Sequence, residues 1–117
     1  MKAITKKEIR EFLKLKLSSD KAWAIRAMSR IYDYQTETEK NYHDTIDRNY
    51  VGFSGADAKI LTSIYDYYKN HGYVSPKQLA IVYKKVPKYW NQIYNISDKS
   101  KLDPMISEYT SSVKRMY

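Results

Sequence analysis

Apolar residues recur at helical spacing along most of this chain, and this periodicity constrains the fold more than any other feature. Leu61, Ile64, Tyr65 and Tyr68, for example, follow one another at the intervals that place side chains on one face of an α-helix. Three glycines and three prolines are the only strong helix breakers in 117 residues, and strand patterns are weak throughout. The sequence therefore predicts an all-α fold, in which these apolar faces pack into one core.

Start and stop signals divide the chain into about five predicted helices. The motif from Thr5 to Glu8 is typical of a capping box, and Ser75 with Gln78 forms a second one. Gly72 suits the left-handed position that ends a helix. The resulting prediction is a compact bundle in a single domain of residues 1–117, with helices over residues 5–17, 21–35, 54–71, 75–94 and 103–114.

Two places depart from this regular pattern. Residues 36–52 are polar, rich in acidic side chains and without a steady apolar period, so we expect a long irregular loop between the second and third helices. Loops of this length in a small domain are often functional. Pro87 lies inside the fourth predicted helix, where it removes a backbone donor and disfavours helical geometry at Val86. The sequence therefore predicts a kink or break near Val86.

Composition excludes several classes of protein. The chain has no cysteine, which rules out disulfides, thiolate metal sites and cysteine nucleophiles. No apolar run approaches the roughly 20 residues of a membrane-spanning helix, and the first residues are charged rather than the apolar core of a signal peptide. We therefore expect no membrane association and a cytoplasmic location, in the host cytoplasm if the protein is viral.

Catalytic motifs are also missing from the sequence. It contains neither of the common glycine-rich phosphate-binding motifs and no nucleophile elbow, so we expect a non-enzymatic protein without a cofactor or metal. His43, Asp44 and Asp47 lie together in the predicted loop and could bind one metal ion. A metal-dependent nuclease that uses these three residues is the less favoured alternative, because such sites need ligands on a rigid frame.

Positive charge is concentrated in two segments. The chain carries a formal net charge of +8, from 21 basic and 13 acidic residues. Residues 1–17 hold six bases and two acids, and residues 73–96 hold four bases and no acid, so each segment carries +4. Such a distribution favours association with nucleic acid or with an acidic protein surface.

The second basic segment predicts a lysine-rich helix face. If the helix continues past Pro87, Tyr83, Trp90 and Tyr94 fall on its core side, and Tyr89 lies between the two faces. Tyr89 is therefore the candidate for stacking on a nucleic-acid base. The outer face carries Lys77, Lys84, Lys85 and Lys88.

The first basic segment predicts a second stripe. Lys6, Arg10 and Lys14 recur every four residues and therefore share one side of the first helix. Whether the two stripes join in space cannot be derived from spacing. Lysines act mainly as point charges, so both stripes favour contact with the phosphate backbone over readout of bases.

Arginines are the better candidates for specific contacts, because a guanidinium group can bind a base edge through two hydrogen bonds. The chain offers Arg26, Arg30 and Arg48 for this role. For Arg26 and Arg30 we favour a simpler interpretation, in which they pair at the surface with Asp33 or Glu37.

These observations favour a nucleic-acid-binding accessory protein that contacts the DNA backbone through its lysine-rich helix. Whether the ligand is single- or double-stranded, and whether the protein is oligomeric, stays open. The alternative is a protein-interaction module that inhibits or modulates a host or replication enzyme. In that case the basic faces would dock on an acidic partner, and residues 36–52 would contribute contacts.

A spaced pattern of residues runs through the stretches WAIRAMSRIYDYQTETEK, NYVGFSGAD and SPKQLAIVYKKVPKYWNQI. Its positions are Trp23, Gln35–Thr36, Gly52–Phe53, Asp57–Ala58, residues 75–78, Lys88–Tyr89 and Gln92. This pattern resembles a small all-helical module of phages and mobile elements, which also occurs beside helicase-like domains. The resemblance covers about residues 20–93 and implies a setting in DNA metabolism or phage–host interaction. Pro87 departs from the uninterrupted fourth helix that the module implies.

Overall fold

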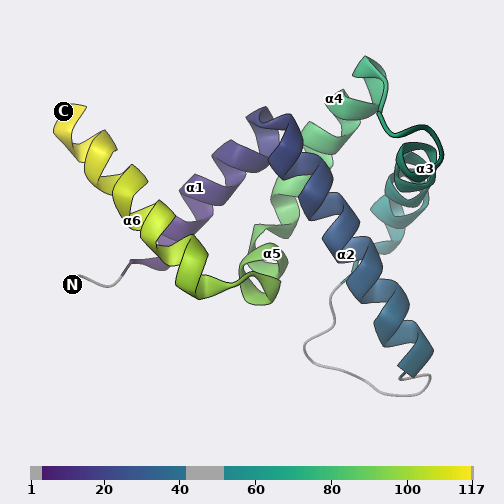
Figure 1. The fold of residues 1–117 in the computed structure, drawn as a ribbon, viewed down its shortest axis with the longest axis horizontal. Helices are drawn as coiled ribbons and strands as arrows, with labels where there is room; N and C mark the ends of the chain where they lie inside the picture. Colours follow the sequence, from purple (N-terminus) through teal and green to yellow (C-terminus); the bar gives the residue numbers. More distant parts are fainter. Residues whose placement is uncertain (1–3, 42–51, 117) are drawn as a thin grey trace.

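The computed structural model describes residues 4–41 and 52–116, and these residues form helices joined by short linkers. In chain order the elements are α1 (Lys6–Ser19), α2 (Lys21–Asn41), α3 (Gly55–His71), α4 (Pro76–Lys85), the 3₁₀-helix η1 (Val86–Tyr89), α5 (Trp90–Ile96) and α6 (Lys99–Met116) (Figure 1). The prediction of a compact all-α bundle is confirmed. Four of the predicted helices each correspond to one helix, and the fourth predicted helix is divided into α4, η1 and α5.

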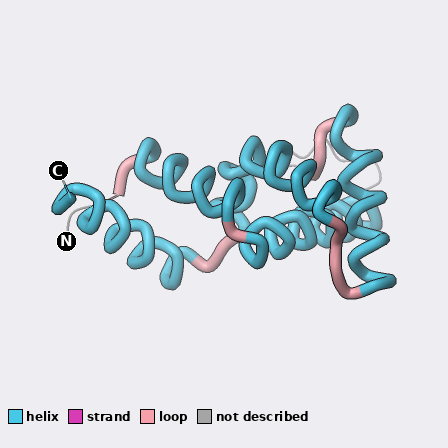
Figure 2. The backbone as a smooth tube through the Cα atoms, turned by 90° about the horizontal axis from the view of Figure 1, so that it is seen from above, coloured by secondary structure: helices cyan, strands magenta, loops and turns pink. Residues whose placement is uncertain are grey.

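The first helix is the central element of the bundle. It contacts α2, α4, η1, α5 and α6, whereas α3 packs against α2 and α4. Figures 1 and 2 show α3 at one end of the molecule, with the start of α1 and the end of α6 at the other. The molecule measures 45 × 36 × 22 Å, so its shortest dimension equals about two helix diameters.

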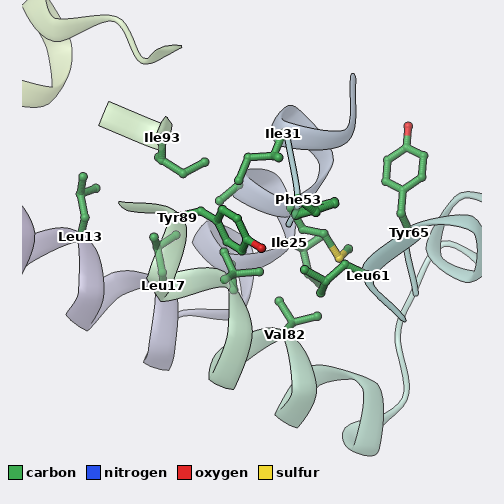
Figure 3. Packing of buried hydrophobic residues seen from close by; sticks show 14 of the residues in the cluster. Leu13, Leu17, Ile25, Ile31, Phe53, Leu61, Tyr65, Val82, Tyr89 and Ile93 are labelled. Atoms are coloured by element: carbon green, nitrogen blue, oxygen red, sulfur yellow. The ribbon is translucent and has the colours of Figure 1, made fainter. Parts of the chain in front are cut away.

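One continuous core joins all of these helices. Leu13 and Leu17 from α1 are fully buried, as are Met28 and Ile31 from α2. Leu61 brings α3 into the same cluster (Figure 3). Burial of each such side chain stabilises the fold by about 1.5–3 kcal/mol, so the apolar faces expected from the sequence are what hold the bundle together.

Most of the predicted helix boundaries agree with the structure. The Thr5 hydroxyl caps α1 by accepting a hydrogen bond from the Glu8 N–H, and Asp20 ends α1 and caps α2. The capping box of Ser75 and Gln78 is complete, with hydrogen bonds in both directions. These signals were readable because a cap depends only on residues within one helical turn.

The second helix is longer than predicted. It continues to Asn41 instead of ending at residue 35, and residues 42–51 of the predicted loop lie outside the described part of the chain. Residues 36–41 have no apolar period but contain no glycine or proline, so nothing in them stops a helix. Within the described part of α2, Tyr34 is 45% exposed, whereas Ile25 is buried.

The expected interruption at Pro87 is confirmed. The Val86 N–H donates to the Val82 carbonyl and completes α4, after which the chain makes a 3₁₀ turn before α5 begins at Trp90. Pro87 cannot donate a backbone hydrogen bond, and the tighter 3₁₀ turn accommodates that loss. The three segments therefore replace one straight helix.

The last helix begins earlier than predicted. It starts at Lys99 instead of near Asp103 and ends at Met116, so Pro104 lies inside it. Asp98 provides the start signal, because its carboxylate accepts hydrogen bonds from the N–H and hydroxyl groups of Ser100. These bonds, from the Ser100 hydroxyl first, lower the pKa of Asp98.

Candidate functional site

Lys77 and Lys84 lie on the solvent-facing side of α4, and both are exposed. They are about two helical turns apart and therefore share one face of the helix. Neither forms an ion pair with any residue that the structure describes. This part of the predicted lysine face is open to an anionic ligand.

Lys85 and Lys88 are occupied by a carboxylate from another helix. The Lys85 Nζ atom lies 3.0 Å from Asp57 Oδ1, and the Lys88 Nζ atom lies 2.6 Å from Asp57 Oδ2. Asp57, in the first turn of α3, is 1% exposed, whereas the Lys85 and Lys88 side chains are 31% and 58% exposed. Lys88 is exposed as expected, but Lys85 is half-buried, and both lysines neutralise a buried acid that the sequence did not indicate.

Tyr89 is a core residue rather than an accessible stacking ring. It is 7% exposed, and its ring packs edge to face against Phe53 with 5.5 Å between centroids. Figure 3 shows it among Leu17, Ile25 and Phe53. A 3₁₀-helix turns about 20° more per residue than an α-helix, so η1 changes the direction in which Tyr89 points. The prediction of an exposed ring at this position is wrong.

The hydrogen bonds of Asp57 keep it ionised. The hydrogen bond from Lys88 is the largest influence and lowers the pKa of the Asp57 carboxyl below its ordinary range, against the opposing effect of burial. Hydrogen bonds from Tyr89 and Lys85 act in the same direction. In return, Asp57 raises the pKa of Lys88. Two lysines against one carboxylate leave this cluster with an excess of positive charge.

The same cluster anchors the chain that leads into α3. The backbone N–H groups of residues 52–54 donate hydrogen bonds to Gln92 Oε1, Gln35 Oε1 and the Tyr89 hydroxyl, each at 2.9 Å. The Tyr89 hydroxyl in turn donates to Asp57 Oδ2 at 2.7 Å. This polar network ties α2, η1 and α5 to the start of α3.

Half of the positions of the spaced sequence pattern meet in this network. They are Gln35, Gly52–Phe53, Asp57, Lys88–Tyr89 and Gln92. In this chain these residues therefore build an internal joint between helices. The sequence gives no signal for these pairings, because the partners are 18–40 positions apart along the chain.

The second predicted stripe lies on the central helix. Lys6, Arg10 and Lys14 are exposed on α1 and form no ion pair with a described residue. Because α1 packs against α4, η1 and α5, the two basic helices are neighbours in the bundle.

Arg30 has a partner that the sequence did not indicate. Arg30 donates a hydrogen bond to the Ile96 carbonyl at 2.8 Å, which joins α2 to the end of α5. Asp33, the expected partner, accepts a hydrogen bond from the Tyr65 hydroxyl at 3.0 Å. The predicted pairing of Arg26 or Arg30 with Asp33 is therefore wrong, whereas the side chain of Glu37, the other expected partner, and Arg48 lie outside the described residues.

A groove that the sequence did not indicate lies between α2 and α3. It has a volume of about 660 Å³, and we call it the α2–α3 groove. Its lining residues are Lys21, Ala22, Ile25, Arg26, Ser29, Asp33, Tyr65, Tyr68, Lys69, Gly72 and Tyr73.

Tyr65 forms one buried wall of the groove. Burial, followed by the hydrogen bond to Asp33, raises the pKa of its hydroxyl to about 12. Its ring stacks on Tyr32 with 4.1 Å between centroids, so Tyr65 is held rigidly from both sides.

The candidate metal ligands of the alternative nuclease, His43, Asp44 and Asp47, lie outside the described residues. Elsewhere, within residues 4–41 and 52–116, the structure contains no group of three potential metal-ligating His, Cys, Asp or Glu side chains. None of the described helices is both long enough and apolar enough to span a membrane.

Comparison with known proteins adds no assignment. No family model, curated protein or solved structure matches this chain.

Proposed function

We propose that this chain is a non-enzymatic nucleic-acid-binding accessory protein that contacts the DNA backbone through α4 and α1. The observation that carries the proposal is the pair Lys77 and Lys84, exposed on one face of α4 without an acidic partner among the described residues. Unpaired lysines on a regular helix suit phosphates, which need positive charge but little directional geometry.

Charge elsewhere on the molecule supports the same function. Lys6, Arg10 and Lys14 supply a second exposed cationic stripe on α1, which packs against α4. Lys88 adds further positive potential, because it stays 58% exposed while it pairs with Asp57. The net charge of +8 would also raise the rate of encounter with a polyanion. The resemblance to a module of phages and mobile elements favours a setting in such a genome.

Salt dependence provides the test. Affinity for fluorescently labelled single- and double-stranded DNA is measured by anisotropy at about 50 and about 200 mM salt. We expect binding that weakens steeply at the higher salt concentration, because phosphate contacts release counterions. The double substitution Lys77→Gln/Lys84→Gln should weaken duplex binding and reduce the salt slope by about two, roughly one per lysine.

A matched control removes the same charge from other faces. Lys59 on α3 and Lys101 on α6 are exposed, so Lys59→Gln/Lys101→Gln lowers the net charge equally without touching α4. We expect this variant to keep most of the affinity for duplex DNA and most of the slope of its salt dependence. Absence of binding at the lower salt concentration would refute the proposed function. Equal losses of duplex affinity in the two double variants would refute the assignment to α4.

A further inference from the structure

The α2–α3 groove combines cationic side chains with aromatic rings. Lys21 and Arg26 on α2 and Lys69 on α3 line it, against the single acid Asp33. The Asp33 carboxylate accepts the hydrogen bond of the buried Tyr65 hydroxyl. The charge of the groove is therefore positive and complements an anionic ligand.

Tyr73 gives the groove an exposed ring held in a fixed position. It is 53% exposed, although large aromatic side chains of small domains are usually well buried. Its neighbour on one side, Gly72, caps α3 in the left-handed conformation, and Val74 on the other side is 6% exposed. The backbone of Tyr73 is thus fixed at both ends.

Two further rings support Tyr73 from the side. Tyr67 lies edge to face against it with 5.8 Å between centroids, and His71 stacks on Tyr67 at 4.0 Å. The Tyr67 hydroxyl also donates to the Tyr73 hydroxyl at 3.4 Å. An exposed ring that is ordered in advance loses little conformational entropy when a ligand stacks on it.

We propose that the α2–α3 groove binds an unpaired base and its adjoining phosphates in single-stranded nucleic acid. Tyr73 stacks on the base, while Lys21, Arg26 and Lys69 contact the phosphates, a combination typical of single-strand binding sites. The groove volume of about 660 Å³ lies within the usual range of about 300–1,000 Å³ for ligand pockets. A duplex hides its bases in the helical stack, so the groove selects single strands.

This inference rests on the proposed function and gives it a strand preference. The lysines of α4 and α1 would contact phosphates of either form of DNA, whereas the groove would add contacts that only an unpaired base can make. The two surfaces therefore predict different responses to substitution.

The first test compares two substitutions at one position. We expect Tyr73→Ala to weaken binding of labelled oligothymidylate about tenfold, because a stacking ring is lost, and to leave duplex affinity unchanged. Tyr73→Phe keeps the ring and should bind like the original protein. The side chain is 53% exposed and lies outside the helices, so neither change should unfold the domain. The circular dichroism of both variants checks this.

The second test locates the base directly. Oligothymidylate containing 5-iodouracil is crosslinked by light, and the modified peptide is identified by mass spectrometry. We expect the crosslink at Tyr73 or Tyr68. An oligoglutamate peptide serves as a second anionic probe, and binding as tight as that of the oligonucleotide would show an acidic-peptide site and overturn the inference.

The outcomes separate the two proposals. If Tyr73→Ala binds oligothymidylate normally or the crosslink maps elsewhere, the groove inference fails, while a loss caused by Lys77→Gln/Lys84→Gln still supports the proposed function. If Tyr73→Ala alone weakens binding, the groove stands and the assignment to α4 fails. Binding of neither oligonucleotide by the original protein overturns both.

Discussion

At the scale of single residues, Asp57 explains why the lysine-rich segment is not a simple exposed face. A buried carboxylate is unfavourable unless it is paired and hydrogen-bonded. Asp57 receives hydrogen bonds from Lys85, Tyr89 and Ser54 and an ion pair from Lys88, so the carboxylate is well satisfied. Its effect is to fix the start of α3 against η1.

Substitution of Asp57 should reveal this role through pH. We expect Asp57→Asn to reduce the free energy of unfolding at pH 7 by about 2 kcal/mol, because charged hydrogen bonds are lost. Folding lowers the pKa of Asp57, so its stabilisation is present above about pH 4 and declines as pH falls toward the folded-state pKa. Urea unfolding at several pH values should therefore show the difference between the two proteins shrinking below about pH 4.

Asp66 provides the control for this experiment. It is an exposed acid on α3, so Asp66→Asn removes the same charge from the same helix. We expect a change below about 0.5 kcal/mol for this variant. A difference between the original protein and Asp57→Asn that is constant from pH 7 to about pH 3 would contradict the role assigned to the Asp57 carboxylate.

At the scale of helices, the C-terminal end of α3 shows how local chemistry determines where a helix ends. Gly72 ends α3 with a φ of 81°, in the left-handed region that disfavours other residues. Its N–H donates to the Tyr68 carbonyl at 2.7 Å, which closes the last turn. This turn directs the chain toward Ser75, where α4 starts.

Two glycine substitutions isolate the effect of backbone conformation. A Cβ atom at Gly72 or at Gly55 would meet nothing within 4 Å, so neither change introduces a clash. We expect Gly72→Ala to destabilise the protein by about 1 kcal/mol, because alanine is strained at this φ. Gly55→Ala, in the first turn of α3, should be neutral or stabilising by up to about 1 kcal/mol. Equal changes in urea midpoint for both variants would contradict this explanation.

At the scale of the whole molecule, α1 holds the bundle together. It touches five other elements, and Leu13 and Leu17 on its inner face are fully buried. Because a domain of this kind is stable by only about 5–15 kcal/mol, the loss of one central side chain is a large fraction of the total.

Two leucines on α1 allow a direct comparison. We expect Leu13→Ala to reduce the free energy of unfolding by about 3 kcal/mol, since it leaves a cavity in the core. Leu15 lies on the same helix but is 44% exposed, so Leu15→Ala should cost less than about 1 kcal/mol. Both values come from urea unfolding followed by circular dichroism. A similar loss of unfolding free energy in Leu13→Ala and Leu15→Ala would show that α1 is not the centre of the core.

Local signals in the sequence were enough to predict most of the helices and their caps. Ser75, Gly72 and Pro87 each act within about one turn of chain, so their effects could be predicted without knowledge of the fold. The C-terminal turns of α2 and the first turn of α6 were missed because these turns lack an apolar period.

The candidate site was less predictable, because its members come from distant parts of the chain. The exposure of Lys77 and Lys84 followed from helical spacing, but the engagement of Lys85 and Lys88 depended on Asp57, about 30 positions away. The α2–α3 groove gave no sequence signal at all, since Arg26, Lys69 and Tyr73 belong to separate segments.

The sequence by itself determined an all-helical chain, its main breaks and a strong positive charge, because these properties arise from neighbouring residues and composition. Only the tertiary structure decided which cations and rings are free to bind. Packing placed Tyr89 in the core and Lys88 beside a buried acid, and it left Tyr73 exposed beside three cationic side chains. Exposure and pairing depend on contacts between residues far apart in sequence, and spacing along one helix does not specify them.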